Sequence, residues 1–281
     1  MTVRAGALGS LLKDRKIGLA LSSGAARGLA HIGVLEMLEE EEIHIDMLAG
    51  TSMGALIGAV YAERQDIDRM KHLAIELGLK RFSFLADPVL PKYGLIRGRK
   101  IGNMLRSIIG DVEFGDLKIP FACSAVDINS NQEVVIKQGK VREGVRASCS
   151  IPILLTPSKL EGRYLVDGGL LDPVPVKILK DMGADPIIAV NVIPNGQNTF
   201  LGASQNNRRK NGPNILSIAI QTVNIISSQR LKSSLSGADV IIEPQVTHIS
   251  WGDFHRAEEC IVQGRLAAQV SIPEIKRLLA G

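Results

Sequence analysis

The feature that most constrains this sequence is a serine placed between two glycines at the junction of two apolar segments. Residues 47–49 are typical of the end of a buried strand, and residues 55–60 are typical of a buried helix. Ser52 lies between them, with Gly50 two residues before it and Gly54 two residues after it. A strand, a sharp turn and a helix with Gly-x-Ser-x-Gly at the turn is the context that a nucleophilic serine needs. The pattern predicts a serine hydroxyl at the end of a strand, where backbone N–H groups stabilise a developing oxyanion.

The competing interpretation is a close strand–helix turn in which the serine has no chemical role, because glycines also allow the two elements to pack tightly. This is the only Gly-x-Ser-x-Gly in the chain. With 28 glycines in 281 residues, about 0.2 such matches are expected by chance. The rarity of the match favours the nucleophile.

A second candidate is the run of small residues at 22–28, which follows an aliphatic strand at 16–21 and precedes an amphipathic helix. Backbone N–H groups in such a loop, at the start of a helix, attract negative charge. Three interpretations are open: a phosphate or dinucleotide loop, an oxyanion loop that serves Ser52, and tight strand–helix packing. Gly24 and Gly28 do not make Gly-x-Gly-x-x-Gly, which counts against the dinucleotide loop.

The third candidate is Asp167, which ends a predicted strand at 164–166 and is followed by Gly168 and Gly169. An acidic residue at a strand end, with two glycines after it, can lie close to another segment of backbone. The alternative is an ordinary Asp-Gly turn.

The alternation of strands and helices predicts one α/β domain with a central, mostly parallel sheet flanked by helices. We expect residues 1–15 to be an N-terminal tail and 16–281 to be this domain, with the motifs between 16 and 192. The polar segment 195–214 is expected to be a mobile surface loop. C-terminal helices follow, with a break before Pro273, which opens a last turn of helix.

Composition limits the partners and the compartment. The net charge of +4 is mild and scattered, which argues against nucleic acid as a partner. The three cysteines are widely spaced and odd in number, as in a reducing compartment. No apolar run reaches the length of a membrane span and the N-terminus is a poor signal peptide, so we expect a cytoplasmic protein.

Segment 81–97 is apolar and interrupted by prolines, and three basic residues lie at 97–100. It is either a lid or acyl-chain wall beside Ser52, or an irregular buried connection. The first interpretation, with the cationic residues that follow, predicts transient contact with a membrane or micelle surface.

Taken together, the three motifs resemble those of the patatin-like phospholipase family, from about residue 16 to residue 192. Residues 21–28 resemble its glycine-rich oxyanion loop, 50–54 its nucleophile motif and 167–169 its Asp-Gly-Gly motif. The run at 146–152 is similar to the segment that precedes the aspartate in that family. The resemblance implies a three-layer α/β/α fold and hydrolysis of lipid acyl esters.

The resemblance also implies a Ser-Asp dyad, with no metal and no other cofactor. Ser52 would attack an ester carbonyl and Asp167 would take its proton, while the N–H groups of Gly24, Ala25 and Met53 hold the oxyanion. Residues that support these loops are Arg27, Gly28, Gly50, Gly54, Gly168 and Gly169. The chain departs from the commonest family pattern at Ser23 and Ala25, where glycine is usual, so the shape of the oxyanion loop is expected to differ. The substrate class is open between phospholipid, lysophospholipid, neutral ester and acyl-thioester, and the oligomeric state is not indicated.

Two alternatives remain. One is a Ser-Asp-His triad. His248 and His255 follow Asp167 in the order of the α/β-hydrolases, and His31 lies near the run of small residues at 22–28. The other is a patatin-like domain that binds lipid or a protein partner without turnover.

Overall fold

The computed structural model describes residues 15–79, 98–194 and 215–280. Segment 81–97, for which a lid and a buried connection were both open, lies outside the described residues. The expected mobile loop at 195–214 and nearly all of the expected N-terminal tail also lie outside them.

Five parallel strands form the centre of the sheet, in the order β3-β2-β1-β7-β8. Their bounds are β1 Gly18–Leu21, β2 Met47–Thr51, β3 Phe121–Asp127, β7 Ile187–Val190 and β8 Val240–Ile242. Antiparallel strands extend the sheet at β3: β6 (Arg163–Asp167) and β4 (Gln132–Ile136) both pair with β3, and β5 (Ser158–Leu160) pairs with β6. The expected mostly parallel sheet is confirmed, with an antiparallel extension on one side.

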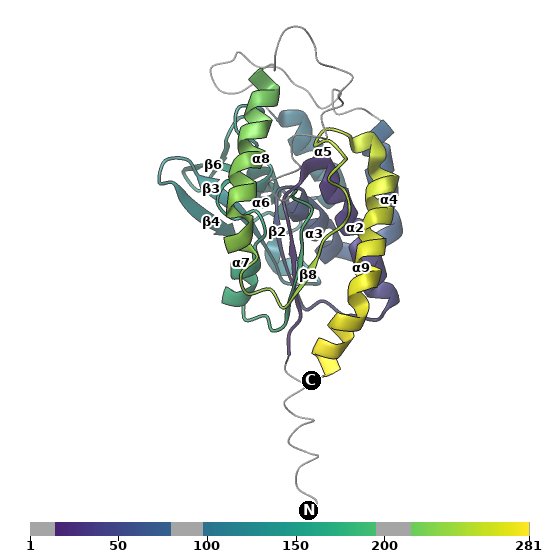
Figure 1. Ribbon diagram of the computed structural model, residues 1–281. Helices are drawn as coiled ribbons and strands as arrows, with labels where there is room; N and C mark the ends of the chain where they lie inside the picture. Colours follow the sequence, from purple (N-terminus) through teal and green to yellow (C-terminus); the bar gives the residue numbers. More distant parts are fainter. Residues whose placement is uncertain (1–14, 80–97, 195–214, 281) are drawn as a thin grey trace, which may run out of the picture.

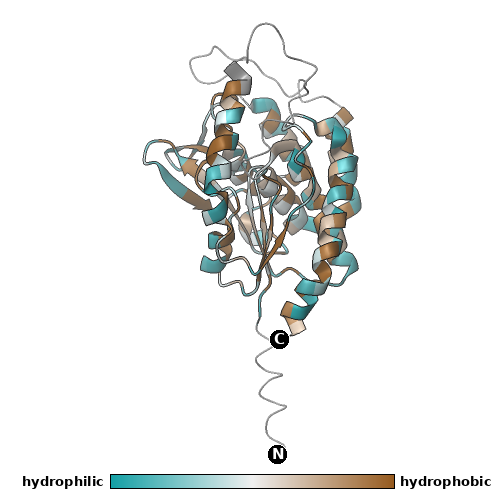
Figure 2. Cartoon of the chain, in the orientation of Figure 1, coloured by the Kyte–Doolittle hydropathy of each residue, from teal (hydrophilic) through white to brown (hydrophobic). Residues whose placement is uncertain are grey.

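The central strands are apolar throughout because both faces of the sheet are covered. In β1, Leu19 and Leu21 pack in the larger of two hydrophobic clusters, whereas Ala20, which points to the other face, packs in the smaller one. All four residues of β1 and of β7 are buried. The hydropathy colouring agrees, since the central strands are mostly brown whereas the helices carry both brown and teal residues (Figure 2).

Helices cover the sheet in two layers (Figure 1). The larger cluster is formed with α2 (Ala30–Glu40), α3 (Met53–Arg64), α4 (Ile67–Leu79), α5 (Arg99–Ile109), α6 (Val141–Ser148) and α9 (Ala257–Ala280). The smaller cluster is formed with α7 (Val176–Asp181) and with Leu231 of α8 (Ile215–Ser234). Short 3₁₀ helices lie at η1 (Ala25–Leu29), η3 (Phe114–Asp116), η4 (Gly168–Leu170) and η6 (Phe254–Arg256). The chain is therefore a three-layer α/β/α domain, as expected.

The break predicted before Pro273 is wrong, because α9 continues through this residue to Ala280. A proline inside a helix removes one backbone hydrogen bond and crowds the preceding turn. On either side of it, Ile272 and Ile275 are 7% and 0% exposed. Their burial against the core offsets the local penalty of the proline.

The register of the sheet brings distant residues to one level. Thr51 at the end of β2 is paired with Ser124 of β3, and the next residue of β3, Ala125, is paired with Asp167 of β6. The residue that follows β2 and the residue that ends β6 therefore lie close together. Among the described helices, including the 24-residue α9, none combines the length and the hydropathy of a bilayer-spanning helix.

Candidate active site

Ser52 occupies a strained turn between β2 and α3. Its backbone angles are φ 55° and ψ −116°, a region that residues other than glycine rarely adopt. A Cβ atom at Gly50 would lie 2.4 Å from the carbonyl oxygen of Gly54, and one at Gly54 would lie 2.2 Å from that of Leu21. Both glycines of the motif are thus needed for β2, α3 and β1 to meet at this turn.

Hydrogen bonds from the end of α6 hold the strained serine. The Ser52 N–H donates to Ser148 Oγ at 2.9 Å, and Cys149 Sγ donates to the Ser52 carbonyl oxygen at 3.2 Å. These two residues belong to the run at 146–152 that resembled the family. Nothing in their spacing indicated that they contact the backbone of Ser52.

The Ser52 side chain meets that of Asp167. Ser52 Oγ donates to Asp167 Oδ2 at 2.6 Å, and the Gly169 N–H donates to the other carboxylate oxygen at 2.8 Å. Ser52 and Asp167 are 7% and 3% exposed. Burial raises the pKa of the Asp167 carboxyl to about 6. The hydrogen bonds from Ser52 and Gly169 favour the charged form and lower the pKa, but burial has the larger effect. The carboxylate is thus a stronger base than an exposed aspartate and is still mostly ionised at neutral pH.

The two glycines after Asp167 allow this approach. A Cβ atom at Gly168 would lie 2.4 Å from the Ser124 carbonyl oxygen, and one at Gly169 would lie 3.1 Å from Asp167 Oδ1. The Gly169 carbonyl oxygen accepts a hydrogen bond from Ser227 Oγ of α8 at 2.7 Å. Sequence reasoning missed Ser227, because it lies in a helix without a motif.

Two residues of the loop after β1, Gly24 and Ala25, line the pocket that contains Ser52 and Asp167. Ser23 N–H and Ala26 N–H donate to the carbonyl oxygens of Pro173 and Trp251, at 2.9 and 3.0 Å. The N–H groups of Gly24 and Ala25, between them, have no acceptor among the described residues. Ala25 has a φ of 49°, so this departure from the family pattern lies in the left-handed region that favours glycine.

The third expected oxyanion donor is Met53. It is the first residue of α3, so its N–H has no acceptor within the helix. Its side chain lies across Gly28, where a Cβ atom would be 2.5 Å from Met53 Cγ. Gly24 is similarly constrained, since a Cβ atom there would lie 2.4 Å from Val192 Cγ2.

Arg27 is a buried cation in the wall of this pocket. It is 5% exposed, and its Nε atom has no hydrogen-bond partner among the described residues. Burial lowers the pKa of the guanidinium to about 10, so it remains charged at neutral pH. An anionic group that entered the pocket would offset part of the lost solvation of this charge.

The pocket around Ser52 and Asp167 encloses about 520 Å³ of empty space, counted with its opening to solvent. Its remaining lining residues are Ser23, Gly24, Ala25, Arg27, Ile151, Ile193, Ile220, Val223, Asn224, Ser227 and Trp251. Sequence reasoning missed Ile193, the four from α8 and Trp251. The helical spacing of 220, 224 and 227 shows that they share one face, but nothing in the sequence shows which element that face covers.

The five histidines are all described, and none lines this pocket. His31 is completely buried, its Nε2 lies 2.9 Å from the Ser22 carbonyl oxygen, and burial lowers its pKa to about 4. His248 Nε2 lies 2.7 Å from Glu259 Oε1, and His255 is exposed. None of the three candidates for a triad contacts Asp167, whose carboxylate is bonded to Ser52 and Gly169.

Comparison with known proteins gives consistent matches. The family model for patatin-like phospholipase matches residues 19–180. An uncharacterised NTE family protein of Mycobacterium tuberculosis is 38% identical over 63% of this chain and 49% of that protein. Lysophospholipase nte1 of Aspergillus fumigatus is 36% identical over 64% of this chain and 12% of that protein. The chain thus spans about half or less of the length of these relatives. Among solved structures, VipD from Legionella pneumophila matches with a TM-score of 0.48 and 13% identity, over 91% of this chain and 67% of that chain.

Proposed function

The chain belongs to the patatin-like phospholipase family, and from that premise we propose that it is a serine lipid acyl hydrolase with a Ser52–Asp167 dyad. The observation that carries the proposal is the 2.6 Å hydrogen bond from Ser52 Oγ to Asp167 Oδ2. A nucleophile and its base must lie within hydrogen-bond distance, and a base should have a pKa close to the working pH. Burial, which raises the pKa of Asp167 to about 6, supports this role.

The proposed reaction has two steps. Ser52 Oγ attacks the ester carbonyl carbon as its proton passes to Asp167, and the carbonyl oxygen becomes an oxyanion. The N–H groups of Gly24, Ala25 and Met53 stabilise this charge. Asp167 returns the proton to the leaving alcohol, which departs and leaves an acyl-enzyme. Water then attacks the acyl carbon as its proton passes to Asp167. The bond from the acyl carbon to Ser52 Oγ breaks, Asp167 returns the proton to Ser52 Oγ, and the fatty acid is released.

Arg27 and the relatives support a substrate that carries a phosphate. A buried guanidinium in the pocket wall favours an ester that carries a negative charge, such as the phosphate of a phospholipid or lysophospholipid. One relative bears the name lysophospholipase. We therefore propose that phosphate-bearing acyl esters are better substrates than neutral esters.

Contact with a lipid surface is part of the proposal. Arg99, Lys100, Arg106 and Arg142 line an open depression at α5 and α6, and Asp111 pairs with the last two. Glu143 also pairs with Arg142. The basic lining of the depression favours an anionic surface, with each basic residue near it worth on the order of 1 kcal/mol. Such a surface would orient the enzyme without anchoring it.

Active-site labelling tests the proposal. Treatment with a fluorophosphonate, followed by peptide mass spectrometry, should place the adduct on Ser52. Ser52→Ala should abolish both the adduct and the release of fatty acid from lysophosphatidylcholine. A protein that hydrolyses none of the four ester classes, and whose Ser52 stays unlabelled, would instead be a non-catalytic binding domain.

A further inference from the structure

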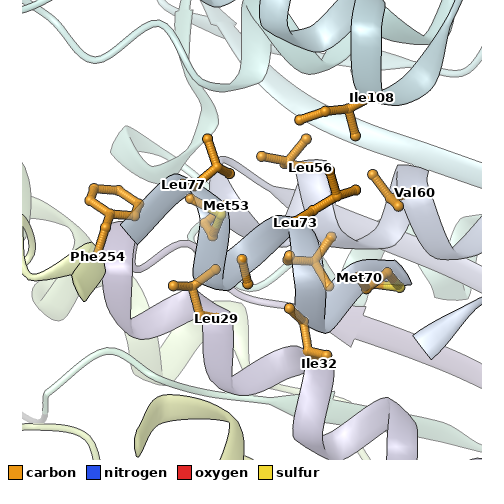
Figure 3. Close-up of a pocket in the computed structure, with 12 residues that line it drawn as sticks. Leu29, Ile32, Met53, Leu56, Val60, Met70, Leu73, Leu77, Ile108 and Phe254 are labelled. Atoms are coloured by element: carbon orange, nitrogen blue, oxygen red, sulfur yellow. The ribbon is translucent and has the colours of Figure 1, made fainter. Parts of the chain in front are cut away.

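A second pocket lies between α3 and α4, and Met53, the residue after Ser52, is part of its lining. Figure 3 shows side chains of α2, α3 and α4 converging on it, with Phe254 at one end and Val60 and Met70 toward the other. All twelve residues that line it are apolar. A charged or polar head group would lose its solvation there without compensation, so an apolar ligand is the chemical class that fits.

The two pockets share a wall. The turn 52–53, the loop 27–29 and the segment 251–254 each contribute one residue to the Ser52 pocket and another to the apolar pocket. The wall is thus built from single turns of three chain segments. A group bound covalently to Ser52 lies beside Met53, whose side chain already lines the apolar pocket.

Met53 is suited to open this wall. Its side chain is only partly buried and lies against Gly28, which has no side chain to hold it there. Leu73 and Leu77 of α4, which line the same pocket, are also partly exposed. Methionine is unbranched and adapts to irregular spaces, so Met53 can move to admit a ligand. Met70 provides similar freedom inside the pocket.

We propose that this apolar pocket binds the acyl chain of the substrate, with Met53 as the gate and Val60 at its far end. The inference rests on the proposed esterase function. From Met53 to Val60 the pocket follows α3 for about 10 Å, given the rise of 1.5 Å per residue of an α-helix. The acyl chain leaves the carbonyl at Ser52, passes Met53 and extends along α3, while the head group stays on the side of Arg27. The far end of the pocket limits the length of chain that binds well.

The test is the dependence of kcat/KM on acyl length, measured with p-nitrophenyl esters from acetate to palmitate. Each added methylene should raise kcat/KM by about fourfold until the chain reaches Val60, beyond which the gain should stop. Val60→Phe should move the optimum to shorter chains, and Val60→Ala should move it to longer ones. Loss of stability alone would change all esters alike and would not move the optimum in opposite directions.

Val176→Ala is the matched control, since it makes the same change at a buried valine in the smaller cluster on the opposite face of the sheet. It should leave the optimum where it is in the wild type. An optimum that is identical in the wild type and both Val60 variants, with Ser52 still labelled and esters still hydrolysed, would overturn the pocket assignment alone. Absence of labelling and of all hydrolysis would instead overturn the proposed function. If Val60→Phe fails to fold, the pocket assignment is tested by Val60→Ala alone, for which the acyl-length optimum should move to longer chains.

Discussion

Ser52 Oγ lies 2.6 Å from Asp167 Oδ2 although 115 residues separate the two in the chain. Two strand pairings produce this proximity, since β2 is paired with β3 and β3 with β6. Ser52 is itself held in a strained conformation by Ser148 and Cys149. The fold itself therefore aligns the pair, which is the arrangement that the proposed proton transfer would require.

Asp167→Asn should lower kcat by about 10²- to 10⁴-fold, the usual contribution of a general base, because an amide cannot accept the serine proton. It should not lower the melting temperature at pH 7. The folded-state pKa of about 6 exceeds the unfolded value of about 4, so the stability linked to this group is present below about pH 4 and lost as the pH rises through 6. At pH 7, Asp167→Asn removes a buried charge and with it the free-energy cost of the lost solvation of that charge.

The matched controls for this variant are His31→Ala, His248→Ala and His255→Ala. Each should retain most of the activity in a folded protein, because none of these side chains contacts the Ser52–Asp167 pair. Steady-state assays and circular dichroism melts of all four variants decide the point. A histidine variant as inactive as Ser52→Ala would favour the triad.

The pH dependence of kcat/KM should report Asp167 directly. Only the ionised carboxylate accepts a proton, so activity should rise about tenfold per pH unit below pH 6 and level off above it. A neutral ester is the right substrate, because it does not titrate in this range. An inflection near pH 7 that disappears in a histidine variant would contradict this assignment.

Ala25→Gly should stabilise the protein by up to about 1 kcal/mol, because glycine adopts a positive φ without strain while losing more entropy on folding. Ala26→Gly is the matched control: Ala26 is buried next to it without a positive φ, and its replacement should destabilise by about 0.5–1 kcal/mol. Urea unfolding measures both. Equal destabilisation by the two changes would show that Ala25 is not strained.

Arg27→Met should reduce kcat/KM for lysophosphatidylcholine by about 10- to 100-fold, the range expected for a lost hydrogen bond to a charged group. The monoacylglycerol with the same acyl chain is the control, because it lacks the phosphate. Its kcat/KM should change much less. A similar loss on both substrates would mean that Arg27 supports the loop and does not bind the phosphate.

Binding to anionic liposomes should weaken as salt is added, and the double variant Arg99→Ala with Lys100→Ala should weaken it further. The control is Lys177→Ala with Lys180→Ala, which removes the same charge from exposed positions on α7. Co-sedimentation distinguishes the two surfaces. Equal loss in both double variants would indicate an effect of net charge without a docking face.

Much of the fold was predictable from local patterns. The aliphatic runs at 16–21 and 47–49 became β1 and β2, and the buried helix predicted at 55–60 lies within α3. Burial of both faces of a parallel sheet imposes these apolar runs, so they can be recognised without knowledge of their neighbours. The turn at Ser52 was also recognisable, because the glycines that it needs lie within two residues.

Contacts between distant segments were decided only by the tertiary structure. The continuation of α9 through Pro273 depends on the burial of Ile272 and Ile275, which no local propensity reports. The pairing of Ser52 with Asp167 was suggested by family resemblance alone, and its catalytic role remains a prediction. Ser148 lies in the run at 146–152 that resembled the family, but its contact with Ser52 was not indicated, and Ser227 and the apolar pocket beside Met53 had no sequence signal. Sequence patterns report local backbone preference and the burial of a face, whereas the identity of the facing residue depends on how sheets and helices pack.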